Sequence, residues 1–119
     1  MRQVAMALLL VLAPLAALAG EAVEVTVEVV SISADYGNID TDAGLGQVEA
    51  LKLENGDTFK VRFKDREFPV TLGTTYSDVP EGDWVAFVTD SGSLRIARNY
   101  ENAAGTLGVR EGDRIILSR

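Results

Sequence analysis

The stretch TTYSDVPEGDWVAFVTDSGSLRIARNYENAAGTLGVREGDRIIL, residues Thr74–Leu117, decides the fold class. Two runs rich in apolar residues, Asp83–Thr89 and Ser93–Asn99, are separated by Asp-Ser-Gly, and a third run follows at Arg114–Leu117. Between them, Glu101–Leu107 has the pattern of a helix of one or two turns, followed by the glycine that commonly ends a helix. Short strands separated by turn residues are typical of all-β domains.

The residues before this stretch add further strands. Glu21–Val29 alternates valines with polar residues, which predicts a half-buried strand. Asn55-Gly56 predicts a tight hairpin between strands at Gln47–Leu53 and Thr58–Phe63. Phe68–Leu72 contains a proline, which favours the edge of a sheet. Together the pattern predicts a small antiparallel β-barrel, closed or partly open, with one short helix.

A seven-residue pattern occurs twice. Val79–Val85 and Val109–Ile115 share V-x-E-G-D-x-[VI], and each copy stands just before a predicted strand. Glycine allows a left-handed turn, and the aspartate can accept hydrogen bonds from nearby loop amides. We interpret the repeat as one type of turn used twice.

The first residues have the features of an export signal. Arg2 precedes an apolar stretch, Val4–Leu18, and Ala17-Leu18-Ala19 has the form that signal peptidase accepts. The alternative is an uncleaved membrane anchor, but the stretch is short and contains a proline. We expect a signal peptide at 1–19, one domain at 20–119, no stable membrane anchor after cleavage, and a periplasmic or secreted protein.

Composition limits the chemistry. The chain of 119 residues has no His and no Cys. Ser-His-Asp and Cys-His catalysis, and the common zinc sites, are therefore excluded within this chain. The formal net charge of −7 disfavours nucleic acid as a partner.

The polar loop SADYGNIDTDAG, Ser33–Gly44, has three interpretations. The first interpretation is a plain turn, which its Asp, Asn and Gly content favours. The second interpretation is a calcium loop, because Asn38, Asp40, Asp42 and Glu49 partly follow the spacing of an EF-hand. Alanine, however, occupies the position where an EF-hand loop needs glycine. The third interpretation is a binding loop for a small molecule.

The third interpretation comes from a resemblance. DYGNIDTD, Asp35–Asp42, resembles the D-x-F-G-N-x-x-T-N stretch of the SAM hydroxide adenosyltransferase family, which includes the fluorinase and chlorinase that use S-adenosyl-L-methionine (SAM). Thr74–Leu117 is similar to the end of that family's carboxy-terminal domain, including S-x-G-x-L-x-I-A, an Asn and N-A-A-x-x-L-G in the same order. The two blocks cover about half of residues 20–119.

The resemblance implies a small β-barrel that supplies part of an adenosine pocket at a subunit interface. It implies SAM or adenosine as the ligand, and no further cofactor or metal is expected. The matching positions are Tyr36 (an aromatic beside the purine), Asn38 (an amide for the purine edge), Tyr76, and Arg98, Asn99 and Tyr100, whose backbone lies near the adenine.

Each of these residues also has a purely structural interpretation. Tyr36 and Tyr76 could cap the barrel core, Asn38 could serve a left-handed turn, and Arg98 could be solvated or ion-paired. The sequence has no counterpart of the family's larger amino-terminal domain, which carries the water-activating residues. We therefore expect no catalytic residues here.

The favoured hypothesis is an exported, non-catalytic module that binds an adenosine-like ligand. The first alternative is a structural or protein-interaction barrel without nucleoside binding. The second is an accessory subunit of a separate catalytic chain. The expected partners are an adenosine-like small molecule or a protein, and oligomers are compatible with the resemblance.

Overall fold

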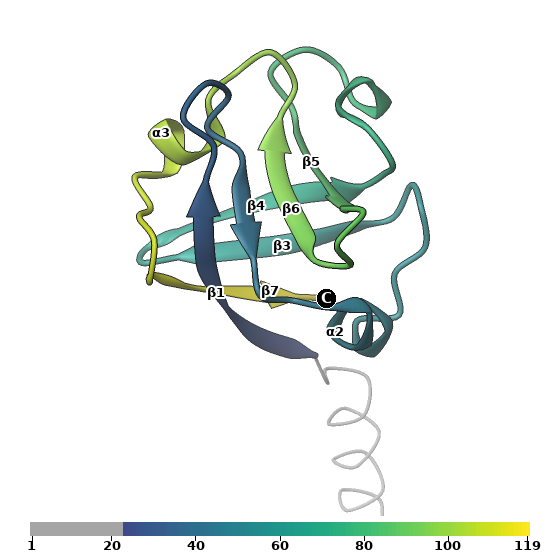
Figure 1. The fold of residues 1–119 in the computed structure, drawn as a ribbon. Helices are drawn as coiled ribbons and strands as arrows, with labels where there is room; N and C mark the ends of the chain where they lie inside the picture. The colour runs from purple at the N-terminus through teal and green to yellow at the C-terminus, as the bar shows by residue number, and fades with distance from the viewer. Residues whose placement is uncertain (1–22) are drawn as a thin grey trace, which may run out of the picture.

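Seven strands close into a barrel in the order β1-β2-β6-β5-β4-β3-β7 (Figure 1). The structure is a computed structural model and describes residues 23–119; the expected signal peptide lies outside these residues. The elements are β1 (Glu24–Ile32), β2 (Ile39–Thr41), α2 (Leu45–Ala50), β3 (Thr58–Phe63), β4 (Arg66–Leu72), the 3₁₀ helix η1 (Tyr76–Asp78), β5 (Trp84–Val88), β6 (Leu94–Arg98), α3 (Ala103–Leu107) and β7 (Arg114–Ser118). The predicted all-β barrel is confirmed in its closed form, in which each of these strands has a neighbour on both sides.

Strand β1 forms because its valines alternate with polar residues. Val27 and Val29 face the core and are buried, whereas Thr26 is exposed. The strand pairs with β7 along its first half and with β2 along its second half. A β-bulge between Val29 and Ser31 lies within the pairing with β2 and leaves Val30 exposed.

Strands β3 and β4 form an antiparallel hairpin. Phe59, Val61 and Phe63 point into the core. On the outer face, Arg62 lies 3.5 Å from Glu24 of β1 and 3.9 Å from Glu67 of β4. The basic row of β3 is therefore a solvated face beside acidic neighbours.

The predicted strand at Gln47–Leu53 is wrong. Leu45–Ala50 forms helix α2, whose start is capped where the Gln47 side chain accepts a hydrogen bond from the Gly44 amide over 2.8 Å. Val48 and Leu51 are both buried, and residues three apart share a helix face. Asn55-Gly56 therefore connects this helix region to β3 and does not make a hairpin; β3 turns into β4 instead.

Two other details differ from the expectation. There are two short α-helices in the described residues, whereas the sequence pattern predicts one. The sheet is antiparallel except between β4 and β5, which run parallel at Thr71 and Leu72. The reason is the connection: the segment containing η1 joins β4 to β5, so the chain can re-enter the sheet in the same direction. Pro69 lies in the part of β4 that pairs with β3 alone.

The two E-G-D turns, Glu81–Asp83 and Glu111–Asp113, confirm the interpretation of the repeat. Each glycine has a positive φ, 87° at Gly82 and 91° at Gly112. Each aspartate amide donates to the carbonyl three residues earlier over 3.0 Å, and β5 or β7 follows.

A small second cluster outside the barrel core supports the candidate site. Val85 and Ala97 are cross-strand partners on β5 and β6 whose side chains pack with Val79, not with the main core. Tyr76 and Phe87 pack against this cluster. Apolar packing therefore fixes the segment containing η1 against the outside of the barrel.

None of the helices in residues 23–119 has the length and apolar composition needed to cross a membrane.

Candidate ligand pocket at one end of the barrel

Three segments that are distant in the sequence enclose a pocket of about 760 Å³. They are the β1–β2 turn, the segment containing η1, and the residues between β6 and α3, which lie at the end of the barrel away from α2 (Figure 1). All six residues predicted from the sequence line this pocket: Tyr36, Asn38, Tyr76, Arg98, Asn99 and Tyr100.

Asn38 is held by its own loop. Its amide donates to Ser33 Oγ over 3.0 Å, and its carbonyl accepts from the Ser33 amide over 3.1 Å. Gly37 supports the turn with a φ of 67°, and a Cβ there would meet Asn102 Oδ1 at 2.0 Å. Glycine at this position therefore lets the loop pack directly on the residue that caps α3.

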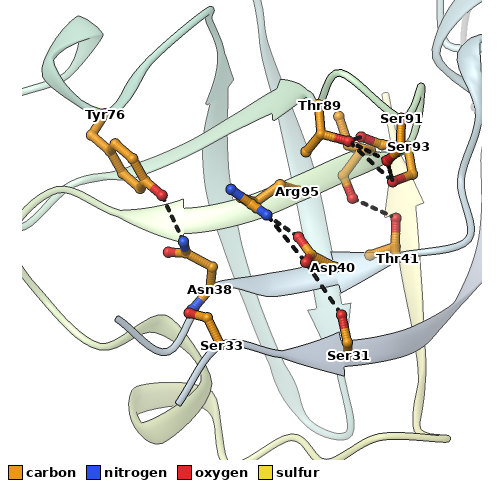
Figure 2. A network of polar contacts seen from close by, with 11 residues as sticks. Ser31, Ser33, Asn38, Asp40, Thr41, Tyr76, Thr89, Ser91, Ser93 and Arg95 are labelled. Carbon is orange, nitrogen blue, oxygen red and sulfur yellow. Dashed lines mark hydrogen bonds and ion pairs between the residues drawn. The ribbon is translucent and has the colours of Figure 1, made fainter. Parts of the chain in front are cut away.

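The Asn38 side chain has a fixed orientation. Its Nδ2 donates to the Tyr76 hydroxyl over 2.6 Å (Figure 2), and the residue is only 4% exposed. Tyr76 is half-buried, with its ring edge-on to Phe87 at 5.2 Å between centroids. Within the described residues, Asn38 Oδ1 accepts no hydrogen bond, so this oxygen remains available as an acceptor for a ligand.

Arg98 is bound within the protein. Its Nε and Nη2 donate to the Gly82 carbonyl over 2.9 and 2.6 Å, and its Nη1 donates to Thr106 Oγ1 over 3.0 Å. The guanidinium also lies over the Trp84 ring, 5.5 Å from its centroid, and 3.9 Å from Glu101. Arg98 therefore ties β6 to the first E-G-D turn. Of its two structural interpretations, the ion-paired one is confirmed by the contact with Glu101.

Asn99 has a similar bracing role. Its Nδ2 donates to the Val79 carbonyl over 2.9 Å, and its backbone pairs with Asp83 and Gly82. Only 8% of Asn99 is exposed. The side chain thus fixes the wall of the pocket.

Tyr36 and Tyr100 form an exposed rim. Tyr36 is 70% exposed and Tyr100 is 83% exposed. The interpretation of Tyr36 as a cap on the core is therefore wrong, whereas Tyr76 does pack against the second cluster. The three tyrosines of the chain all line this one pocket.

Five further residues line the pocket that the sequence did not suggest: Asp35, Thr75, Ser77, Glu101 and Asn102. Asn102 caps α3, since its Oδ1 accepts a hydrogen bond from the Gly105 amide over 2.6 Å. An asparagine before a short helical pattern is a signal for such a cap. The others are exposed polar residues for which the sequence gives no signal.

An ion pair lies beside the pocket. Arg95 Nε donates to Asp40 Oδ1 over 2.6 Å, and Ser31 Oγ donates to Asp40 Oδ2 over 3.2 Å (Figure 2). The hydrogen bond to Asp40, with a smaller contribution from the Tyr76 hydroxyl, raises the pKa of the Arg95 guanidinium. Arg95 thus supports the side of the site on which Tyr76 stands.

A second hollow of about 430 Å³ borders Arg95 and Asp40. The hydroxyls of Thr89, Ser91 and Ser93 meet there within 2.9–3.4 Å of one another (Figure 2). The hollow is small and mainly polar.

The calcium interpretation of Ser33–Gly44 has no support. Asp40 is paired with Arg95, Asp42 accepts from the Glu28 amide, and Glu49 lies on α2. Within residues 23–119, His, Cys, Asp and Glu form no group of three or more that could hold a metal ion. The loop also contributes to the core, because Ile39, Thr41 and Ala43 are fully buried.

Comparison with known proteins decides the family. The model of the SAM hydroxide adenosyltransferase C-terminal domain matches residues 27–116. The chain belongs to this family. The resemblance seen in the two sequence blocks is thereby confirmed, and the match extends over nearly the whole barrel.

Two solved structures resemble this SAM hydroxide adenosyltransferase C-terminal domain. An uncharacterized conserved protein from Thermotoga maritima matches with a TM-score of 0.77 and 29% identity, over 81% of this chain and 36% of that one. A conserved hypothetical protein from Thermus thermophilus matches with a TM-score of 0.55 and 29% identity, over 77% of this chain and 34% of that one. The chain therefore spans about a third of the length of these proteins. A search of curated proteins found no match.

Proposed function

We propose that this barrel is an adenosine-binding module that does not catalyse a reaction by itself. The observation that carries the proposal is that Tyr36, Asn38, Tyr76 and Arg98–Tyr100 surround a single pocket although they come from three distant segments. Membership in the SAM hydroxide adenosyltransferase C-terminal domain family supports the same ligand class.

The size and chemistry of the pocket suit a nucleoside. Its volume of about 760 Å³ lies within the range of roughly 300–1,000 Å³ typical of small-molecule sites. Tyrosine rings offer flat apolar faces to a purine. The free Asn38 Oδ1 can accept a hydrogen bond from the exocyclic amino group of adenine.

Isothermal titration calorimetry with adenosine and with SAM tests the proposal. We expect heat of binding for adenosine. We expect Asn38→Ala to bind adenosine about tenfold more weakly, which corresponds to the loss of one hydrogen bond between uncharged groups. Asn55→Ala is the matched control, because Asn55 lies in the exposed turn before β3. Absence of binding at millimolar adenosine would contradict the proposal.

The non-catalytic part of the proposal rests on the residue types. The chain has no His and no Cys. The pocket offers hydroxyls, side-chain amides, the guanidinium of Arg98 and two carboxylates. The carboxylates belong to Asp35 and Glu101, which are both exposed. We therefore expect adenosine and SAM to be recovered unchanged after incubation with the purified chain.

One observation favours a second role as an accessory subunit. Tyr36 and Tyr100 expose large aromatic surfaces on the pocket rim, where a second protein could cover a bound nucleoside. Co-purification from the periplasm is the test. A catalytic chain that is retained by the wild type and lost with Tyr36→Ser and Tyr100→Ser together would support this role.

Export remains part of the proposal. The apolar stretch and the Ala17-Leu18-Ala19 motif support cleavage before Gly20 or Glu21. Sequencing of the amino terminus of protein recovered from the periplasm should begin at Gly20 or Glu21. An intact Met1 or retention in the membrane fraction would contradict it.

A further inference from the structure

The charges that line the pocket are unusual for a nucleotide site. Asp35 and Glu101 are two acidic lining residues, and Arg98 is the one cationic residue among the lining residues of the described chain. Two carboxylates against one guanidinium leave one negative charge in excess at the pocket. The whole chain adds to this field with its formal net charge of −7.

Three of the five N–H groups of Arg98 are committed to protein acceptors, one on each guanidinium nitrogen. Arginine binds phosphate through N–H groups that point outward as a fork. Here Nε and Nη2 both donate to the Gly82 carbonyl, and Nη1 donates to Thr106 Oγ1. Turning the guanidinium toward a ligand would leave the Gly82 carbonyl without these donors and release the first E-G-D turn.

The amino terminus of a helix is a second common phosphate-binding group, and here its amides are already hydrogen-bonded. The amino terminus of α3 borders the pocket, and free amides at a helix start attract anions. The Ala104 amide donates to the Gly37 carbonyl over 2.8 Å, and the Gly105 amide donates to Asn102 Oδ1 over 2.6 Å. The Thr106 amide donates to the Asn102 carbonyl over 3.0 Å. The protein's own groups therefore cap this helix.

We infer that the pocket selects unphosphorylated adenosine and discriminates against its 5′-phosphates. This inference rests on the proposed adenosine-binding function. A phosphate group carries about two negative charges near pH 7, and it would enter a site with excess negative charge and no uncommitted cation among the lining residues. Repulsion across several ångströms of partly hydrated space weakens binding by about tenfold at low ionic strength.

The test compares adenosine with AMP by calorimetry on the full chain, at low and at physiological ionic strength. We expect AMP to bind about tenfold more weakly at low salt, with the ratio of the two affinities shrinking as salt is added. Glu101→Gln and Asp35→Asn should each reduce this ratio about threefold, because each removes one repulsive charge.

Glu49→Gln is the matched control. It changes the net charge by the same amount but lies on α2, at the opposite end of the barrel (Figure 1). It should leave the adenosine-to-AMP ratio unchanged. If Glu49→Gln lowers the ratio as much as Glu101→Gln does, the discrimination comes from overall charge and the inference about the pocket is wrong.

The two proposals can fail separately. Adenosine binding with equal or tighter AMP binding would overturn the inference and leave the proposed function intact. Failure of both ligands to bind would overturn the proposed function and this inference with it. Tighter adenosine binding, with a ratio that depends on Asp35 and Glu101, would support both.

Discussion

Asn38 combines burial with a single free acceptor. The loop holds its backbone through Ser33, and the Tyr76 hydroxyl accepts one Nδ2 hydrogen. Oδ1 and the second Nδ2 hydrogen therefore remain for a ligand. If adenosine binds as proposed, Oδ1 in this fixed orientation would accept from the amino group of adenine and would repel the carbonyl of hypoxanthine or guanine at the same place. Tyr76 would then act on specificity through Asn38, as a positioning residue.

Tyr76→Phe tests this role. The substitution removes the hydroxyl that accepts the Asn38 Nδ2 hydrogen bond, which should lower the free energy of unfolding by about 1–2 kcal/mol. The freed amide can then rotate, so we expect adenosine to lose its advantage over inosine. Urea denaturation measures the stability, and calorimetry with the two nucleosides measures the selectivity.

Tyr100→Phe is the control for that substitution. Tyr100 is 83% exposed, and its hydroxyl has no hydrogen bond within the described residues. The free energy of unfolding of Tyr100→Phe should stay within about 0.5 kcal/mol of that of the wild type. A Tyr76→Phe variant that keeps the wild-type preference for adenosine would show that Asn38 is positioned by other contacts.

Gly37 is the residue on which the docking of the loop depends. Gly37→Ala would place a Cβ 2.0 Å from Asn102 Oδ1 at a φ of 67°. We expect the free energy of unfolding to fall by about 2 kcal/mol or more, since the left-handed conformation alone costs about 1–2 kcal/mol. Adenosine binding should weaken as well, because the loop carries Asn38.

Gly46→Ala provides the matched control for Gly37. Gly46 lies within α2 and a Cβ there meets no atom within 4 Å. Alanine in a helix is favoured over glycine by roughly 0.5–1 kcal/mol, so this variant should be slightly more stable than the wild type. Equal effects of the two substitutions would contradict the packing argument at Gly37. Both are measured by thermal and urea denaturation.

At the scale of elements, the segment containing η1 decides both topology and site. It carries the chain from β4 to β5 and so makes the parallel pair, and it places Tyr76 over the outer face of β5 and β6. Asp78 fixes the start of the segment, because its Oδ2 accepts from the Thr74 amide over 2.7 Å and from the Thr75 amide over 3.3 Å. An exposed carboxylate thus orders one wall of the pocket.

These contacts make the segment sensitive to acid. Hydrogen bonds from the Thr74 amide and hydroxyl lower the pKa of Asp78 below its ordinary value of 3.8. The contribution to stability is fully present above 3.8 and is lost as the pH falls through the lower pKa of the folded state, because the unfolded chain takes up the proton first. We expect adenosine binding and the urea midpoint to decline together in this range.

Asp78→Asn separates this carboxylate from the other acids. Its urea midpoint should be lower than that of the wild type at neutral pH and should fall less steeply below about pH 4, since one proton-linked group is gone. Asp65→Asn, in the exposed turn between β3 and β4, is the control and should keep the wild-type pH profile. Identical acid profiles for the wild type and Asp78→Asn would refute the linkage.

At the scale of the whole molecule, β7 closes the barrel between β1 and β3. Ile115 and Leu117 point inward and are fully buried. Leu117→Ala should lower the free energy of unfolding by about 2–5 kcal/mol, through lost burial and the cavity left behind. That is a large share of the roughly 5–15 kcal/mol that stabilises a typical domain.

Ile116→Ala gives the comparison on the outer face of the same strand. Ile116 is only half-buried, so its replacement should have a clearly smaller effect than that of Leu117. Chemical denaturation of both variants is the measurement. Comparable losses at the two positions would mean that β7 does not face the core as described.

Much of the whole fold could be predicted because local pattern determines it. The strands predicted at Thr58–Phe63 and Arg114–Leu117 lie within a residue of their observed ends, since alternation or continuous apolar character specifies a strand directly. The pattern of α2 predicts a strand because a short apolar run fits either structure. Strand β2 was not predicted, because it has only three residues and they stand between polar residues of Ser33–Gly44, where no alternating pattern can be recognised.

The sequence by itself determined a β-barrel of this family and a set of residues that belong to one pocket. Strand alternation, turn residues and the two family blocks are local signals, and they persist in any arrangement of the chain. Only the tertiary structure decided which atoms of each residue are bonded within the protein and which face the pocket. It turned the Arg98 guanidinium onto Gly82, left Asn38 Oδ1 free and exposed Tyr36, because these choices depend on neighbours from distant segments. Hydrogen-bond partners across the barrel end are set by its closure, which no local stretch of sequence encodes.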